Sequence, residues 1–345
     1  MEEAWFMLSV EFERWRTKYI NLEDYMEGNV FHYTSAMALE NIFRNKTLWV
    51  TKSDFLNDKT EYMYAINLVN KIFKINKYKH LDEDVILQIN KVFKSYLSRS
   101  FIFSTSQNSD SVNLWGNYSE HEGYNIGFNL REIFNRMWDG QIYVTGNNKY
   151  KDGSIKKYFI QRKDSHKTIE MSPGKVIYDS IMQENIIVDI FNFLDHISET
   201  FYSFYNKIEE LDKQSMDNLA YHYNNAFGSA IHILVNQIKL FKNPVFEQDE
   251  EYRIIFDVNS KLDVKKYRQY KGVFIPYIEV IFDKSNSIKE LPVDSITIGP
   301  KNNLDIAAKG LCQFIKSQGY KVTVKPEYKN KDKLLIKDSA VPLRY

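Results

Sequence analysis

Cysteine is almost absent from this sequence: Cys312 is the single one among 345 residues. A lone cysteine excludes an internal disulfide and any cysteine-based metal site, which fits a reducing cytoplasm. Its spacing with Leu304, Ala308, Leu311 and Ile315 predicts a small side chain buried on one face of a helix.

An excess of charge of either sign is also lacking. The chain has 46 Lys and Arg against 45 Asp and Glu, a net charge of +1, so no global field draws it to nucleic acid or to an anionic membrane, although a local basic groove is compatible with this balance. The start, MEEAWFMLSVEFERW, is acidic where a signal peptide is basic, and the most apolar window, IIVDIFNFLDHI, is interrupted by Asp189 and Asp195. We therefore expect a cytoplasmic protein without membrane insertion.

Common catalytic motifs are missing as well. The sequence contains no GxGxxG after a strand, no GxxxxGK[ST], no HExxH, no GxSxG and no CxxC. The sequence therefore gives no motif evidence for a dinucleotide dehydrogenase, a P-loop nucleotide hydrolase, a zincin or a serine hydrolase. Because the histidines are scattered, a metal centre would rest on carboxylates, and we predict no metal ligand.

Proline is unevenly placed, with none before Pro173 and six of seven from Pro244 onward. The early part reads as strands FHYT and TLWVT around a helix at about 35–45, then helices at about 59–75 and 83–98. A strand SFIFSTS, a short helix DSVNLWGNYS and a strand GYNIGFNL follow.

The later part predicts a helical segment and then strands. Residues 141–172 are charged and loop-like with hairpin pieces such as KYKDGSIKKYFI, and two long amphipathic helices follow. Strands resume at EYRIIF, GVFIPYIEVIF, SITIGP and YKVTV, with a helix at about 303–317. Because helices and strands are segregated, we predict an α+β fold. Its predicted parts are a first half of the core (1–140), a mostly helical insertion (141–241) and a second half of the core (242–345).

Three segments place polar or aromatic side chains at strand ends: FHYTS, FSTSQNSDSVNLWGNYSEHEGYNIGF and FEQDEEYRIIF. In the third, Glu251 and Arg253 are two residues apart and share one face of a strand, whereas Tyr252, Ile254 and Phe256 take the other. A carboxylate that opens an apolar strand lies at the rim of a core, where it is half desolvated and suited to catalysis. The alternative is an ordinary ion pair on a solvent face.

These segments resemble the prokaryotic family catalogued as domain-of-unknown-function 2971. The resemblance runs nearly end to end, and the helical middle is its least characteristic part. It rests on HYTS, LENIF, TLWVT and FLNDKTEY, on FSTS, LWGNYS and GYNIGF, and on KNPVFEQDEEYR, ITIGPKN and SAVPLRY.

More distantly, the order of these elements is similar to the ADP-ribosyltransferase fold of the His-Tyr-Glu type. That resemblance implies a split β-sheet core with a helical insertion and NAD as substrate. It also implies that His32 binds a ribose hydroxyl with Thr34 beside it, and that Glu251 holds the nicotinamide ribose and stabilises the developing positive charge. Further residues implied near the cofactor are Ser104, Trp115 and Tyr118, one of the latter two stacking on nicotinamide, and Arg253, which orients Glu251 or contacts a phosphate.

The chemistry agrees with this assignment. Breaking an N-glycosidic bond passes through an oxocarbenium-like state, which a fixed carboxylate stabilises. An aromatic face holds a planar pyridinium by stacking and cation–π attraction, worth roughly 0.5 to 2 kcal/mol. Packing alone is the alternative for His32, Trp115 and Tyr118, because core histidines and aromatics at i, i+3 are common.

We therefore expect an NAD-consuming enzyme, either an ADP-ribosyltransferase or an NAD glycohydrolase, serving as a toxin or phage-defence effector. The acceptor would be a macromolecule, nucleic acid included, or a small molecule. One alternative is a metal-dependent nuclease or nucleic-acid-binding protein, in which Asp249 and Glu251 bind a divalent cation. Another is a non-catalytic module that senses a nucleotide.

Overall fold

The computed structural model describes residues 2–19, 27–56, 61–119, 123–160, 169–205, 213–284, 288–301, 303–324 and 333–342. The chain forms two compact units, each with its own core. The helical unit comprises Met1–Asp24, Asn57–Ser98 and Val176–Phe246, and the sheet unit comprises Tyr25–Leu56, Arg99–Lys175 and Glu247–Tyr345.

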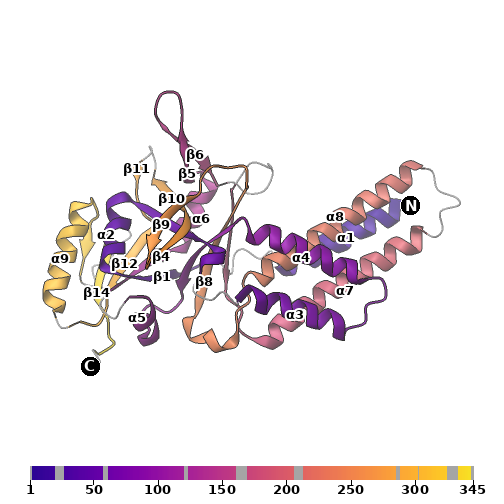
Figure 1. Ribbon diagram of the computed structural model, residues 1–345, viewed down its shortest axis with the longest axis horizontal. Helices are drawn as coiled ribbons and strands as arrows, with labels where there is room; N and C mark the ends of the chain where they lie inside the picture. Colours follow the sequence, from indigo (N-terminus) through magenta and orange to yellow (C-terminus); the bar gives the residue numbers. More distant parts are fainter. Residues whose placement is uncertain are drawn as a thin grey trace. The chain divides into compact units, whose positions relative to one another are not determined.

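The helical unit contains α1 (Glu2–Arg16), α3 (Glu61–Ile75), α4 (Glu83–Leu97), α7 (Ser180–Tyr205) and α8 (Lys213–Ile238) (Figure 1). The apolar stripes of α7 and α8 account for their pairing, because residues such as Ile190, Leu194, Ile231 and Leu234 are buried in one cluster. Helices from three stretches of the chain share this cluster. The helical unit is thus larger than one continuous insertion.

The sheet unit holds a mixed sheet, which for the described residues has 14 strands. Most pairs are antiparallel, whereas β14 pairs in parallel with β12 and β13. At this level the predicted α+β class is confirmed. The strands are β1 (Asn29–Thr34), β2 (Thr47–Lys52), β3 (Ser100–Ser106), β4 (Tyr124–Asn129), β5 (Ile142–Lys149), β6 (Ile155–Phe159), β7 (Ile169–Lys175), β8 (Glu251–Val258), β9 (Lys266–Tyr270), β10 (Val273–Lys284), β11 (Ile288–Lys289), β12 (Val293–Ile298), β13 (Val322–Thr323) and β14 (Leu334–Asp338).

Residues 141–175, predicted to be charged loops and hairpin pieces at the start of the insertion, contain β5, β6 and β7 and belong to the sheet unit. The expected hairpin over KYKDGSIKKYFI is present, since β5 pairs with β6. The pattern of β7, IEMSPGK, was not recognised as a strand because it contains Pro173 and Gly174, which are unusual inside strands.

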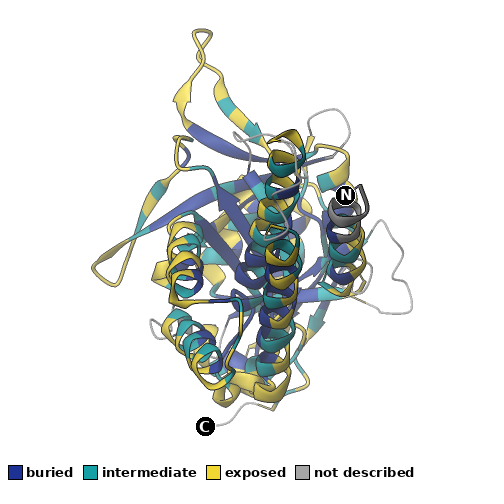
Figure 2. Cartoon of the chain, turned by 90° about the vertical axis from the view of Figure 1, so that its right-hand side faces the viewer, coloured by how far each residue is buried: buried dark blue, intermediate teal, exposed yellow. Residues whose placement is uncertain are grey.

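One face of the sheet, here named the core face, is apolar. It carries Val30, Ile126, Phe128 and Phe256, and these pack in one cluster with residues of α2 (Ala36–Asn45), α6 (Leu130–Trp138) and α9 (Leu304–Ser317). Figure 2 shows these central strands as mainly buried. The short helix α6 is absent from the sequence prediction; Asn129 caps it by accepting a hydrogen bond from the Glu132 amide.

The opposite face, here named the polar face, follows from strand alternation. Directly paired residues point to the same side, and the pairs Ser104↔Arg253, Ser106↔Glu251 and Phe31↔Ser106 put these side chains on one face. Part of this face is covered by α5 (Val112–Tyr118), which contacts β1. The sheet therefore separates a dry side from a polar side.

Strand β3 is where the sheet splits. One edge of β3 pairs with β8 along its full length, from Ser100 to Ser106. The other edge pairs with β1 at Phe31↔Ser106 and with β2 at Thr51↔Ile102. Among the described residues, no strand pairs with Ser104 on that second edge. Two strands thus diverge from β3, and the interruption in strand pairing between them is here named the opening.

No helix in the described part of the chain is both long enough and apolar enough to cross a membrane.

Candidate functional site in the sheet unit

His32 lies at the opening in the sheet. Its Nδ1 is 3.2 Å from the carbonyl oxygen of Ser104, the residue that lacks a strand partner on that edge. A carbonyl oxygen accepts only, so Nδ1 carries the proton and donates, and Nε2 keeps its lone pair. Its ring also contacts Phe103, with centroids 4.8 Å apart. His32 is thus oriented by β3, and its Nε2 is left as an acceptor.

Burial sets the charge of His32. Desolvation lowers the pKa of His32 to about 4; the hydrogen bond to Ser104 opposes this shift, and the positive charge of Arg268 adds to it. At neutral pH the imidazole is therefore uncharged. A neutral ring with a protonated Nδ1 can accept a hydrogen bond from a hydroxyl at Nε2.

Glu251 and Arg253 form a buried ion pair at the start of β8. Arg253 donates from Nε to one carboxylate oxygen at 3.0 Å and from a terminal nitrogen to the other at 2.9 Å. The side chains are 8% and 1% exposed, respectively. The predicted sharing of one strand face is correct, but the pair is in the interior and is not an exposed surface pair. Its two-point geometry holds the carboxylate rigidly.

The structure also resolves which carboxylate of the run Asp249, Glu250 and Glu251 points inward. Glu250 has a φ of 43° and is exposed, and its carboxylate accepts a hydrogen bond from Asn108 at 2.8 Å. The backbone carbonyl of Asp249 accepts a hydrogen bond from Ser106. Glu251 alone of the three is in the regular strand and buried.

Ser104 connects His32 to the ion pair. Its carbonyl meets His32, and across β3 its backbone is paired with Arg253. Neighbouring strands lie about 4.8 Å apart, so β1 and β8, on the two sides of β3, are about 10 Å apart. His32 is paired with Ile126 of the core face, whereas Glu251 is paired with Ser106 of the polar face, so the two side chains leave the sheet on opposite faces.

Thr34 follows His32 by two residues on the same strand face. It is paired with Tyr124 of β4 and is 6% exposed. Its position beside His32 is as predicted, while its side chain is largely enclosed.

The two aromatic candidates differ sharply in their surroundings. Trp115 is 1% exposed, packs edge-on against Tyr33 and donates its indole N–H to Asp110 at 2.7 Å. A Cβ added at Gly299 would lie 3.0 Å from its ring. We therefore assign Trp115 to packing and not to ligand stacking. Tyr118, at the end of α5, is 40% exposed and remains the aromatic candidate.

The loop before α5 lies against the start of β8. Asn108 donates to Glu250, and Asn113 donates to Gln248. These contacts place the beginning of α5 beside the residues that lead into Glu251. They do not by themselves bring Tyr118 to the ion pair.

Arg268 is a residue that the sequence interpretation missed. It lies on β9, donates to the hydroxyl of Thr51 at 3.0 Å, and its Nε has no hydrogen-bond partner among the described residues. Burial lowers the pKa of Arg268. A guanidinium with an unused buried donor, close enough to His32 to influence its charge, is suited to an anionic ligand group. The pattern KYRQY followed by the turn residues KG predicts a hairpin strand that contains Arg268.

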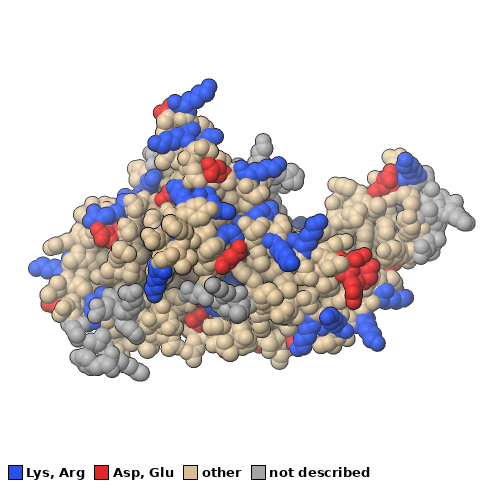
Figure 3. Space-filling view, in the orientation of Figure 1, with Lys and Arg blue, Asp and Glu red and all other residues tan. Residues whose placement is uncertain are grey.

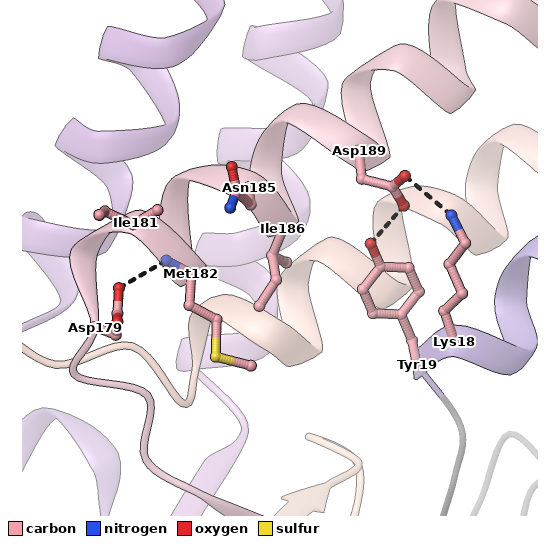
Figure 4. A pocket seen from close by; sticks show the side chains of 8 residues that line it. All are labelled: Lys18, Tyr19, Asp179, Ile181, Met182, Asn185, Ile186 and Asp189. Carbon is pink, nitrogen blue, oxygen red and sulfur yellow. Dashed lines mark hydrogen bonds and ion pairs between the residues drawn. The ribbon is translucent and has the colours of Figure 1, made fainter.

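A separate surface pocket lies in the helical unit (Figure 4). Asp189 there accepts hydrogen bonds from Trp15, Tyr19 and Lys18. Burial favours a higher pKa for Asp189, but these three donors together bring the pKa below its usual value. The satisfied carboxylate links α1 and α7 and indicates a structural role.

Among the described residues, no group of three or more His, Cys, Asp or Glu is arranged to hold a metal ion.

Residues 114–254 match the model of a family described as "Protein of unknown function (DUF2971)". This match supports the predicted family over that part of the chain. The DUF2971 match is shorter than the nearly end-to-end resemblance expected from the motifs: it includes Tyr118, Glu251 and Arg253 but not His32 or Ser104. No curated protein and no solved structure matches the chain.

Proposed function

We propose that the protein consumes NAD, either by transferring ADP-ribose to an acceptor or by hydrolysing NAD, and that the opening beside β3 binds the substrate. The observation that carries this proposal is the divergence of β1 and β2 from one edge of β3, with the buried carboxylate of Glu251 held by Arg253 on β8, which pairs with the other edge. It agrees with the split sheet of the ADP-ribosyltransferase fold, in which two strands diverge from a common neighbour.

The resemblance to ADP-ribosyltransferases implies a role for the residues predicted from the sequence, and Arg268 is added to them here. His32 accepts a ribose hydroxyl at Nε2. Glu251 stabilises positive charge on the ribose as the N-glycosidic bond breaks and its electron pair leaves with nicotinamide. Water or an acceptor then forms the new bond to the same carbon and releases a proton. Arg253 orients Glu251, and Arg268 contacts the diphosphate.

The test is release of nicotinamide from NAD by the purified full-length chain, with and without cell extract as a source of acceptor. We expect Glu251→Gln to lower the rate by about 10²-fold or more, because a fixed negative charge is lost from the transition state. Glu250→Gln is the matched control, since it makes the same change on the exposed neighbour and should leave the rate within about twofold.

Glu251→Gln removes the carboxylate charge beside the buried Arg253, so each variant is compared by its melting temperature. Glu251→Asp keeps the charge but withdraws it by one methylene, and we expect it to lose most activity while it still pairs with Arg253. Failure of the wild type to release nicotinamide under every condition refutes the proposal. Nucleic-acid cleavage that requires Mg²⁺ would favour the nuclease alternative instead.

A further inference from the structure

Two neighbouring hairpins of the sheet unit have an unusual surface. The β5–β6 hairpin projects from the sheet (Figure 1), and β9 and β10 form a second hairpin closed by Lys271 and Gly272, both with positive φ. β10 pairs with both β5 and β9. Asn147 binds the backbone of Asp263 just before β9, so the bases of the two hairpins are joined.

The charge of this surface differs from that of the whole chain. Residues 142–160 and 261–283 contain nine Lys or Arg and four Asp or Glu, a balance of +5, in a chain whose net charge is +1. Figure 3 shows blue side chains gathered on the projecting hairpin. The surface is therefore a local concentration of positive charge that the overall composition conceals.

The acidic residues of this surface are already engaged. Asp152 accepts hydrogen bonds from Ser154, Asp263 from two asparagines, and Glu279 from Lys266 and Thr145, while Asp283 lies 3.9 Å from Lys157. By contrast, six lysines have no ion pair among the described residues: Lys149, Lys151, Lys156, Lys261, Lys265 and Lys271. Their charge is thus available to an anionic partner.

Aromatic rings are exposed among these lysines. The exposed fractions are 53% for Tyr150, 45% for Phe159, 62% for Tyr267, 54% for Tyr270 and 69% for Phe274. The pairs Tyr267↔Pro276 and Gln269↔Phe274 place Tyr267 and Phe274 on the same side of the β9–β10 ribbon. Rings this exposed contribute little to the core, so their role is better explained by a partner.

We propose that the two hairpins bind a single-stranded nucleic acid. Unpaired lysines supply contacts to successive phosphates, and exposed rings supply faces on which unstacked bases pack. An anionic membrane would bind the lysines but would not need aromatic rings spaced along rigid strands. A duplex would also bind the lysines, but its bases are stacked on each other and cannot pack against the rings. This inference is independent of the proposed NAD chemistry, because binding is measured without NAD.

The experiment is fluorescence anisotropy of labelled 20-nucleotide dT and rU strands titrated with the full-length protein at several salt concentrations, with a duplex and anionic phospholipid vesicles in parallel. We expect the single strands to bind more tightly than the duplex, with an affinity that falls as salt rises. The comparison of the dT strand with the rU strand shows whether the protein prefers DNA or RNA.

Two double variants separate charge from stacking. Lys151→Glu with Lys271→Glu should weaken binding and make the slope of log K against log salt shallower by about 1.4, which corresponds to two lost phosphate contacts. Tyr267→Ser with Phe274→Ser should weaken binding by at least about tenfold and leave the slope unchanged. All four side chains are exposed, so folding should be retained.

Matched controls carry the same changes elsewhere. Lys309→Glu with Lys316→Glu on α9, and Tyr221→Ser on α8, replace exposed residues and should bind as wild type. The proposal is overturned if the wild type does not bind single strands at low salt, if the hairpin variants bind as tightly as the controls, or if vesicles or duplex bind better than single strands.

Discussion

The two faces of the central sheet differ in the kind of side chain that they bury. The core face buries apolar side chains such as Ile126, Phe128 and Phe256 under three helices, and close packing is sufficient there. The polar face buries Ser106, Glu251 and Arg253, whose desolvation must be offset by specific partners. The polar face is therefore the more demanding arrangement for stability, since an apolar pair would stabilise the same strands with fewer requirements.

The largest effect should come from breaking the ion pair on the polar face. Glu251→Ala and Arg253→Met should each lower the free energy of unfolding by about 3 to 5 kcal/mol, because each removes one member of a buried ion pair. The double variant Glu251→Leu with Arg253→Met should be more stable than either single variant. Urea midpoints measure all three.

The exposed pair Glu40–Arg44 on α2 is the matched control. Both side chains are at least half exposed. Glu40→Ala should therefore cost about 0.5 kcal/mol or less. A double variant on β8 that is less stable than both single variants would contradict the view that desolvation dominates this pair.

An effect of intermediate size concerns His32. Its pKa is about 4 in the folded protein against an ordinary 6.5. Between these values the unfolded chain takes up a proton that the folded chain does not, so stability falls as the pH decreases from 6.5 to about 4, by up to ~3 kcal/mol. His32→Asn keeps a donor for the Ser104 carbonyl and should lose this contribution. Denaturant unfolding of both proteins across that pH range is the measurement, and identical pH dependence would refute it.

The smallest effect compares two buried threonines. The hydroxyl of Thr297, on the polar face beside Asn125, has no partner among the described residues, whereas that of Thr105 donates to the Tyr252 carbonyl at 2.7 Å. Thr297→Val should be neutral or stabilise by about 1 kcal/mol, and Thr105→Val should destabilise by about 1 to 2 kcal/mol. Melting temperatures measure the difference, and equal shifts would contradict this reading.

Local pattern was enough to predict several strands. SFIFSTS coincides with β3, and FHYT and EYRIIF lie within β1 and β8. The period of two in a strand correctly put Glu251 and Arg253 on one side. These predictions succeed because they depend on residues close together in the chain.

Other features depend on pairings that no local pattern contains. Arg268 reaches Thr51, 217 positions earlier, only because β10 pairs with both β2 and β9. The spacing of Trp115 and Tyr118 shows that they share a helix side but not which ring is covered. The helical unit is likewise assembled from three stretches of the chain, because apolar residues far apart in the sequence are buried in one cluster.

The opening beside β3 has a consequence for how this strand comes apart. An ordinary sheet strand frays from its ends, where its neighbours stop. β3 is clamped at both ends by different neighbours on the same edge, and at Ser104 a single imidazole stands in for a missing strand. Its least supported hydrogen-bonding position is therefore inside the strand, at Ser104, where the main-chain carbonyl depends on the side chain of His32.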